Sequence, residues 1–513
     1  MDDGVLRIVT VPEYPWFVLN MEKVEGRNSY ISEIRKIKRY YIDYDRGAEF
    51  HPEGSRGDYV PSDLRFRICK TLIDKEARFM FSQKPDIFVK AKDTSEILET
   101  QANEYQKLVD KVLKRCNLPK LLLQSARDCF IGKRVACLVD FSEIDGIQIH
   151  FYNSLQFYYE TDYGSDRLTK FISFEQVNRA VAISERKFLV NRYEEQNKRI
   201  HFSSVLYDGA GNVLKVLIPN TILQLDYIPA VVIVNDGTLA KKYGVSEMDI
   251  AYYESVYSKL ANADIDSEGK GMNPTRYTVD MDYRSTTNLP SGPGAYWDLQ
   301  HNQNVNDPKP SVGTLAPQLN HVEAVKTTLE RIKSTMYNEF DIPDISSETL
   351  AGVITSGKTL NALYYPLKVR CDEKLATWKP ALEFVIETIL ELAFLNEAQV
   401  KGMYAITDLK RIQFDVIVEE NYALADDEQE EKDSDINEIN AMARSRKSYL
   451  MKWRRDELNT DEKIEAELMQ IAIEQNMFDT LSMNTSVQNA MQDESETQQV
   501  ESNVEDVNIG LGE

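Results

Sequence analysis

Residues 321–340, HVEAVKTTLERIKSTMYNEF, decide how this chain is organised. Their apolar side chains recur at intervals of three and four residues, and this spacing predicts a helix with one narrow packing seam. The seam consists of Val322, Val325, Leu329, Ile332 and Met336. So narrow a seam is typical of a helix that packs lengthwise against other helices.

A second helix is expected earlier in the chain, from Ser246 to about Asp266. Ser246 stands three residues before Asp249, which is a capping-box-like helix start. One stripe of this helix carries apolar residues at four-residue spacing, namely Met248, Tyr252, Val256 and Leu260. The residues between the two helices begin with a strand-like piece, Arg276–Tyr283, and continue rich in proline and glycine. This order predicts a stalk with a tip, and so long a tip is either functional or a mere surface excursion.

A polar loop, Asp341–Ser356, separates the second helix from a long helical run, Gly357–Leu395. Pro366 and Pro380 lie inside that run. Each proline removes a backbone donor and crowds the preceding turn, so we expect two kinks rather than one straight rod.

The last part of the chain begins with a predicted strand, Arg411–Glu419, and an acidic run that continues to Asp435. Helices are expected over Ile436–Met477. The segment Asn484–Glu513 holds seven acidic residues and no Lys or Arg, so we predict that it is disordered.

The first 245 residues mix both kinds of secondary structure. Helices are predicted at Leu64–Phe81 and at Thr100–Phe130, the latter broken near Asn117–Pro119. Glycines in Tyr207-Asp-Gly-Ala-Gly-Asn212 signal a hairpin, because glycine accepts the positive φ of tight turns. Strands are predicted at Val135–Phe141, Ile147–Tyr152, Phe188–Tyr193 and Val213–Pro219. The fold class is therefore α+β and rich in helix.

The net charge of −23 argues against a protein that wraps DNA tightly, because such a protein needs a basic footprint. An ordinary acidic protein and a wall past which DNA slides both remain open. No apolar window is long enough to span a membrane; Ala381–Leu395 is the best candidate and holds three glutamates. The five cysteines show no CxxC pair and the five histidines no ligand spacing, so we expect no metal and no disulfide framework.

One stretch has an enzyme-like pattern. Gly352-Val-Ile-Thr-Ser-Gly-Lys-Thr359 fits the P-loop that binds nucleotide phosphates. A P-loop needs a buried strand leading into it, but residues 341–351 are polar and contain a proline. The candidate for a second, magnesium-binding strand, Ile412–Glu419, alternates apolar and polar residues and so predicts a half-exposed strand. We therefore expect no nucleotide site, no cofactor and no catalytic residue.

A basic stretch with two interleaved aromatic residues, Tyr449 and Trp453, precedes the acidic end of the chain. It either contacts nucleic acid or neutralises the acids of residues 419–435, and the second use is the favoured interpretation. Its basic residues are Arg444, Arg446, Lys447, Lys452, Arg454 and Arg455.

The order of these segments, from about Tyr40 to Gln475, resembles the portal proteins of tailed double-stranded-DNA bacteriophages, in particular the tall-stem, siphophage-like portals. The resemblance rests on Ile228-Pro-Ala-Val-Val-Ile-Val-Asn235 before the first helix, and on Ser356-Gly-Lys-Thr-Leu360 opening the long helix. Thr71–Asp74 followed by Phe79–Pro85 agrees in kind. The family often has a glycine just before the proline that corresponds to Pro85, whereas this chain has Ser82 and Gln83 in that stretch.

The resemblance implies a portal fold with an α/β wing, a two-helix stem, a small α/β clip, a long kinked helix and a helical crown. On this map the wing would be residues 1–245, the stem helices 246–267 and 321–341, and the clip between them 268–320. The tunnel loop would be 342–356, the kinked helix 357–395 and a strand returning to the wing 396–429. The crown would be 430–480, and 481–513 would be a disordered acidic tail.

The resemblance also implies a structural role without enzymatic activity, in which a homo-oligomeric, dodecameric ring forms the channel for DNA entry during packaging and exit during ejection. The implied partners are double-stranded DNA passing non-specifically, the major capsid and scaffolding proteins, the large terminase subunit and a head–tail adaptor, with no membrane. The implied place is the virion's portal vertex, after assembly in the host cytoplasm. The alternatives are an ATPase using Gly352–Thr359 and an acidic scaffold or adaptor without a DNA role.

Three groups of residues are candidate sites on this map. The tunnel loop would face DNA with Ser346, Ser347, Thr349, Thr355, Ser356 and Lys358. The stem would pack against neighbouring subunits through Val325, Leu329, Ile332 and Met336. Tyr296 and Trp297 of the clip are candidates for docking the motor.

Overall fold

The computed structural model describes residues 14–22, 24, 27–51, 61–92, 96–162, 165, 167–178, 182, 185–235, 241–272, 275–281, 299–300, 309, 311–315, 322–344, 357–406, 409–422, 428–454 and 463–474. The chain divides into two compact units, residues 1–353 with 362–424 and residues 354–361 with 425–513.

Five helices lie in the first 132 residues: α1 (Trp16–Glu22), α2 (Arg27–Arg46), α3 (Ile68–Phe81), α4 (Glu96–Cys116) and α5 (Leu118–Gly132). The predicted break between α4 and α5 is confirmed. Asn117 has a φ of 53°, in the left-handed region that asparagine tolerates better than most residues. Helix α3 begins at Ile68 rather than Leu64.

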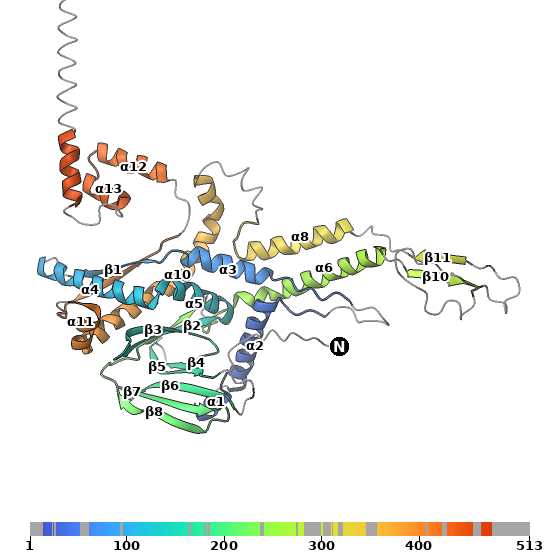
Figure 1. Cartoon of the computed structure of the whole chain (residues 1–513), viewed down its shortest axis with the longest axis horizontal. Helices are drawn as coiled ribbons and strands as arrows, with labels where there is room; N and C mark the ends of the chain where they lie inside the picture. Colours follow the sequence, from blue (N-terminus) through green and yellow to red (C-terminus); the bar gives the residue numbers. More distant parts are fainter. Residues whose placement is uncertain are drawn as a thin grey trace, which may run out of the picture. The chain divides into compact units, whose positions relative to one another are not determined.

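Two antiparallel sheets follow α5 (Figure 1). The smaller sheet has the order β3-β2-β9 and the larger one is a meander, β4-β5-β6-β7-β8. All four strands predicted in this region are confirmed, and so is the hairpin, where Gly211 between β7 and β8 has a φ of +92°. The strands are β2 (Arg134–Ser142), β3 (Gly146–Asn153), β4 (Phe157–Thr161), β5 (Leu168–Gln176), β6 (Lys187–Gln196), β7 (Arg199–Asp208), β8 (Val213–Ile222) and β9 (Ala230–Val234).

A further ladder joins distant parts of the chain. Strand β1 (Asp86–Ala91) pairs antiparallel with β12 (Phe414–Glu419), and Val89 lies opposite Val416. The strand predicted near Arg411–Glu419 is thus confirmed, and it returns to the N-terminal part of the chain.

The largest core cluster lies between α3, α4, α5 and the long helix α10 (Gly357–Leu395). Its largest fully buried side chains include Trp378, Tyr105, Phe81 and Phe130. Two smaller clusters cover the larger sheet. One joins it to α1 and α2, and the other joins it to β2 and β9.

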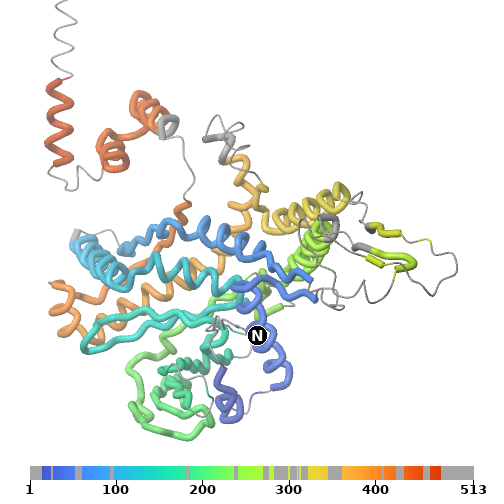
Figure 2. The backbone as a smooth tube through the Cα atoms, turned by 45° about the vertical axis from the view of Figure 1, so that its right-hand side comes forward, coloured from blue at the N-terminus to red at the C-terminus, as the bar shows by residue number. Residues whose placement is uncertain are grey.

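The predicted helix pair is present as α6 (Ala251–Met272) and α8 (Val322–Glu339), which lie side by side (Figures 1 and 2). A short 3-10 turn, η2 (Glu247–Ile250), precedes α6, and the Ser246 hydroxyl caps it by accepting from the Met248 N–H. The hairpin β10 (Thr275–Val279) and β11 (Ser311–Leu315) lies between the two helices in the chain.

Helix α10 continues through both Pro366 and Pro380, and α11 (Glu397–Tyr404) follows it. The two kinks stay a prediction. The second unit holds α12 (Glu428–Asn440), α13 (Arg446–Trp453) and a helix over residues 463–474. There Arg444 and Lys452 both pair with Asp435, so the predicted neutralisation of the acids of residues 419–435 is confirmed for these two bases.

A row of polar side chains lies on one face of α6, at intervals of four residues: Glu254, Ser258, Asn262 and Asp266. Glu254 and Ser258 are fully buried, and Asn262 is 2% exposed. The predicted apolar stripe is buried only in part, because Met248 is fully buried whereas Tyr252 is 71% exposed.

The row exists because a segment without secondary structure of its own, residues 61–67, lies against α6. Asn262 both accepts from the Leu64 N–H at 2.9 Å and donates to the Leu64 carbonyl at 2.7 Å. Asp266 accepts from the N–H and hydroxyl of Ser62, and Ser258 from the N–H of Phe66. The side chains of α6 thus take the place of a neighbouring strand for backbone groups that would otherwise be unpaired.

Glu254 ends this row at the most buried point. Its two carboxyl oxygens accept the N–H groups of Ala48, at 2.7 Å, and Cys69, at 2.6 Å. Burial raises the pKa of Glu254, and the two N–H donors counteract that rise without cancelling it.

Glu254→Ala should lower the free energy of unfolding by about 1–3 kcal/mol for each of the two N–H groups that it leaves unpaired. Urea unfolding followed by tryptophan fluorescence measures this loss. Tyr252→Ala is the matched control on the same helix and should change stability by less than about 0.5 kcal/mol, because Tyr252 is exposed. Equal stability of the two variants would contradict the role given to Glu254.

Candidate functional site

The stem residues predicted from the sequence lie on α8, but at different depths. Met336 is fully buried in the main core, and Ile332 packs against that core. Val325 and Leu329 are only half-buried within the chain. Their packing against neighbouring subunits stays a prediction, for which these two residues are the better candidates.

Most of the other candidate residues lie outside the described residues. These are Ser346, Ser347, Thr349, Thr355 and Ser356 of the loop and Tyr296 and Trp297 of the tip. Lys358 lies in the first turn of α10, where only its backbone is described.

A buried cluster of four charges lies next to the described residues that precede the loop. Glu76 of α3 and Glu247 of η2 supply the acids, and Arg370 and Lys374 of α10 supply the bases. Lys374 contacts Glu76 at 2.7 Å and Glu247 at 2.5 Å, and Arg370 contacts the same two acids at 2.8 and 2.7 Å. Each base therefore bridges both acids, and three separate elements are joined at one point.

The four side chains of the cluster are largely buried. The Glu76 side chain is fully buried, and that of Lys374 is 5% exposed. The Lys374 ammonium also lies 3.9 Å from the centre of the Phe130 ring, and the Asn235 amide donates to Glu247. Charges at this depth are tolerated only when each has partners, so the four side chains depend on one another.

Arg370 extends the cluster to the start of the loop. Its Nη1 donates to the Glu339 carbonyl at 2.9 Å, and its guanidinium lies 5.3 Å from the centre of the Phe340 ring. Lys333 pairs with Asp344 at 2.9 Å, and Ile342 is buried. The last turn of α8 and the residues after it are thereby fixed to α10, which begins at the other end of the loop.

Electrostatics in the cluster favours the charged forms. Burial alone would raise the pKa of Glu247, but the charges of Lys374 and Arg370 outweigh it and hold that pKa below its usual range. Burial acts to lower the pKa of Lys374, but Glu247 and Glu76 raise it.

Sequence reasoning missed this cluster. Arg370 and Lys374 stand four residues apart on α10, next to the buried Cys371 and Leu375. Two bases among core positions of one helix are a signal that buried acids are needed elsewhere. Nothing in the sequence indicates that Glu76 and Glu247 are those acids.

The strand arrangement argues against the nucleotide-binding alternative. A P-loop links a strand of a parallel sheet to a helix, whereas every strand ladder described in this chain is antiparallel. The strand considered for the magnesium-binding acid, β12, pairs antiparallel with β1. Lys358 and Thr359 belong to α10, and residues 345–356 lie outside the described residues.

The described residues provide neither a metal site nor a helix that could cross a membrane. Among these residues, no group of three or more His, Cys, Asp or Glu side chains is arranged to hold a metal ion. The helices in the same ranges also fall short of the length and apolar character that crossing a bilayer requires.

Removing one member of the cluster should lower the free energy of unfolding far more than removing a surface ion pair. Arg370→Met or Lys374→Met should each lower the free energy of unfolding by about 3–5 kcal/mol, because two acids then lose a partner at depth. The control is Arg411→Met, because the Arg411 side chain is 70% exposed in its pair with Glu391 at 2.6 Å and this pair should contribute about 0–1 kcal/mol. Urea unfolding of the three variants measures the difference, and similar losses in all three would contradict the cluster's role.

The stability supplied by Glu247 should depend on pH in a stated direction. Its folded pKa lies below the ordinary value of 4.5, so this stability is fully present above about pH 4.5 and is lost as the pH falls through the folded pKa. The difference in unfolding free energy between the native chain and Glu247→Gln should stay constant from about pH 7 to 5 and shrink below about pH 4.5. A difference that grows on acidification would contradict this assignment.

The comparisons with known proteins concern this same part of the chain. A search of curated proteins found no match. Residues 250–477 match the family model of phage portal proteins, SPP1 Gp6-like. The matched residues begin at the base of α6 and end just beyond the helix over 463–474, so they include the helix pair, both ends of the loop and Arg370 and Lys374. The predicted resemblance to phage portal proteins is thereby confirmed over residues 250–477.

Proposed function

We propose that this chain is the ring subunit of a phage portal vertex and that its ring forms the channel through which double-stranded DNA enters and leaves the capsid. Portal proteins are structural components of the capsid, and the family implies an oligomeric ring. The observation that carries the proposal is that the family match spans the whole order of helix, hairpin, helix, loop and long helix.

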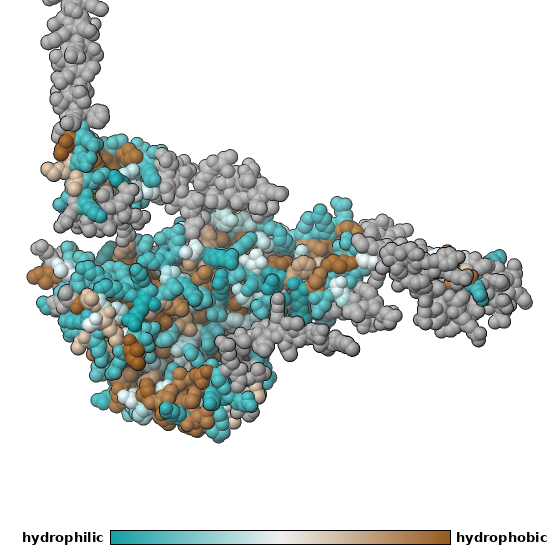
Figure 3. Space-filling model, in the orientation of Figure 1, coloured by the Kyte–Doolittle hydropathy of each residue, from teal (hydrophilic) through white to brown (hydrophobic). Residues whose placement is uncertain are grey.

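The surface of the helix pair supports assembly into a ring. Tyr252 is 71% exposed on α6, and Val325 and Leu329 are half-buried on α8. Apolar residues also gather on the surface of β8, and Figure 3 displays both areas. Apolar surface of this extent is typical of a subunit that neighbours cover. In the proposed ring, the stem residues Val325, Leu329, Ile332 and Met336 form the packing layer. Met336 supports this layer from the core of its own subunit, where it is buried.

The loop between α8 and α10 is proposed to face the channel. Its residues Ser346, Ser347, Thr349, Thr355 and Ser356 are small and polar, and Lys358 in the first turn of α10 adds a single base. Such residues make weak phosphate contacts that carry no sequence information, as a conduit requires. The net charge of −23 would also keep DNA from binding tightly to the wall. The charge cluster would hold the described residues next to the loop steady while DNA moves past it.

The hairpin β10–β11 belongs to the proposed clip. Its exposed apolar residues include Tyr277 and Val312, which are 43% and 51% exposed. We propose that this region, with Tyr296 and Trp297, docks the large terminase subunit during packaging and a head–tail adaptor afterwards. Capsid and scaffolding proteins would contact the wing, and the ring would have twelve subunits.

Electron microscopy and one substitution together test the proposal. Negative-stain images of the purified chain should show end-on rings with a central hole, and Lys358→Ala should leave those rings intact. The purified native chain should hydrolyse ATP no faster than Lys358→Ala. Hydrolysis lost in Lys358→Ala would support the ATPase alternative. A stable monomer, both alone and with purified scaffolding protein, would support the acidic adaptor without a DNA role.

A further inference from the structure

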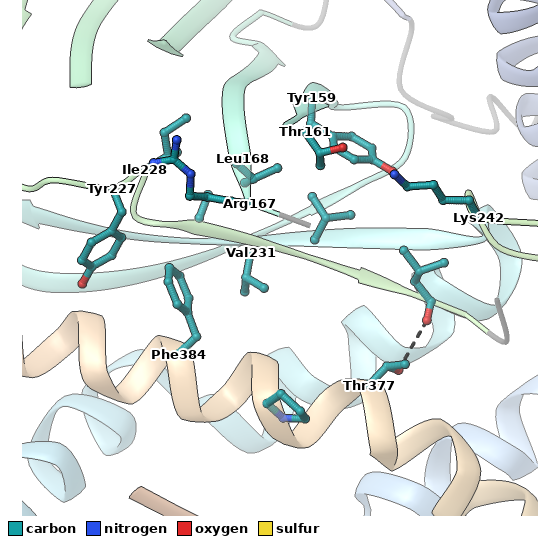
Figure 4. Close-up of a pocket in the computed structure, with 14 residues that line it drawn as sticks. Tyr159, Thr161, Arg167, Leu168, Tyr227, Ile228, Val231, Lys242, Thr377 and Phe384 are labelled. Atoms are coloured by element: carbon teal, nitrogen blue, oxygen red, sulfur yellow. Dashed lines mark hydrogen bonds between the residues drawn. The ribbon is translucent and has the colours of Figure 1, made fainter. Parts of the chain in front are cut away.

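A groove in the first unit has no place in the role proposed above. It has a volume of about 740 Å³ and lies along β9. Helix α10 contributes Pro380 and Phe384 to one wall, and β4 and β5 contribute Tyr159 and Leu168 to the other (Figure 4). The groove therefore opens between two layers of this unit, a helix and a sheet.

The floor of the groove is the open edge of a sheet. Strand β9 is the outermost strand of the β3-β2-β9 sheet. The Asn235 N–H donates to the Lys133 carbonyl, and the Val139 N–H donates to the Pro229 carbonyl. In this register the backbone groups of odd-numbered β9 residues face β2, so those of even-numbered residues face away from it.

The outward backbone groups of β9 are only partly satisfied. The Val234 carbonyl accepts the Thr377 hydroxyl at 3.4 Å, whereas the N–H and carbonyl of Val232 have no partner among the described residues. Val232 is half-buried and lines the groove. A half-buried donor and acceptor favour an occupant that supplies both kinds of group, as an extended peptide does. An acyl chain or another purely apolar ligand supplies neither.

The side chains of β9 show what an added strand would have to carry. Val231 and Ile233 pack with the largest core cluster, which includes α10, whereas Ala230 and Val232 pack with the cluster that joins β9 to the larger sheet. Successive side chains of a strand point to opposite faces, so an added strand would be covered by α10 on one face and by β4 and β5 on the other. Strands covered on both faces are typically continuous apolar runs.

One cation at the groove adds a charge requirement. Lys242 lines the groove near the end of β9 and is exposed (Figure 4). It has no acidic partner in the part of the chain that the structure describes, whereas Arg167, also at the groove, pairs with Glu195 at 2.8 Å. An unpaired base beside an apolar groove favours an occupant with an acid at that end.

The described strands of the chain itself fit these requirements poorly. Strand β8 is exposed along its whole length, but it carries Lys215 and Pro219 and no acid. A lysine would be repelled by Lys242, and a proline interrupts the backbone pairing. A second copy of β8 is therefore a weaker candidate than a segment of another protein.

We propose that the groove receives an extended segment of a partner protein, which pairs with the outer edge of β9. The segment has about five consecutive apolar residues, enough to match β9 (Ala230–Val234) at about 3.3 Å per residue. An acidic residue at one end of it lies beside Lys242. The site is formed within one chain, so it does not rest on ring assembly or on the proposed function.

A display library is the first test. Peptides with about seven randomised residues, the length of β9 with one position added at each end, are displayed on yeast and selected with the purified native chain. Selection should enrich apolar runs with Asp or Glu at one end. No enrichment, or enrichment of sequences without an apolar run, would overturn the proposal.

Two substitutions of one residue test the backbone pairing. A selected peptide should bind Val232→Ala within a few-fold of the native chain and Val232→Pro at least tenfold more weakly, because only proline removes the outward N–H. This N–H takes no part in the pairing with β2, so urea unfolding should show both variants to be folded. Equal affinity of the two variants would mean that the groove acts only as an apolar surface, and would contradict strand addition.

Methylation of the peptide's backbone nitrogens tests the same pairing without changing the chain. In an added strand, the N–H groups of alternate residues face β9. Methylation should therefore weaken binding at least tenfold at alternate positions and only slightly at the positions between them. A uniform effect along the peptide would rule out strand addition.

A matched pair of lysines tests the charge requirement. Lys242 lines the groove and Lys241, its exposed neighbour, does not. Lys242→Glu should weaken binding of the selected acidic peptide several-fold, and Lys241→Glu should not. Equal weakening by both variants would mean that only overall charge matters, and would contradict the groove as the site.

Sedimentation distinguishes a partner protein from a second copy. The native chain and Val232→Pro should have the same assembly state at every protein concentration, because no copy of the chain occupies the groove of another. An assembly that forms in the native chain and is lost in Val232→Pro would overturn the proposal, since a neighbouring copy would then supply the strand.

Discussion

The structure depends on a cluster of four charged side chains that are largely buried from water. Glu76, Glu247, Arg370 and Lys374 come from parts of the chain that are up to about three hundred residues apart, and each base contacts both acids. Apolar packing would hold α3, η2 and α10 together in many slightly different positions. A buried arrangement in which each base bridges two acids is satisfied in far fewer, because each lost contact removes a partner from a buried charge. The cluster therefore sets the position of α10 relative to the base of the helix pair, and through the Glu339 carbonyl it also sets where α8 ends.

The same principle explains why α6 has a polar face turned inward. Residues 61–67 contribute backbone groups to the interior without a strand or helix to pair them, and Asn262 and Glu254 supply the missing partners. A helix so arranged can extend away from the sheets and still be attached along its polar face. The apolar residues of the pair then remain available at the surface, which is the distribution that a subunit of an assembly needs.

Sequence reasoning found the elements and their order, because periodicity and turn residues are local signals. The break at Asn117, the hairpin at Gly211 and the helix pair were all predicted from residues within a few positions of one another. Local signals did not decide burial or ion-pair partners where a distant segment takes part. Tyr252 has the spacing of a core residue, yet it is exposed, since residues 61–67 cover the opposite face of α6. The partners of Arg370 were out of reach for the same reason, because no spacing rule connects position 370 with positions 76 and 247.

The segment 352–359 illustrates how little a local pattern decides by itself. The first N–H groups of any helix lack an intrahelical partner, so Gly357, Lys358 and Thr359 at the start of α10 do not by themselves indicate phosphate binding. Phosphate binding requires in addition a parallel strand that aims the loop, and the ladders described here are antiparallel. In this chain the helix that the motif opens is instead fixed one to two turns beyond Pro366, at Arg370 and Lys374. Among the described residues, the chemistry of α10 is thus that of a helix joined by buried ion pairs to α3 and η2.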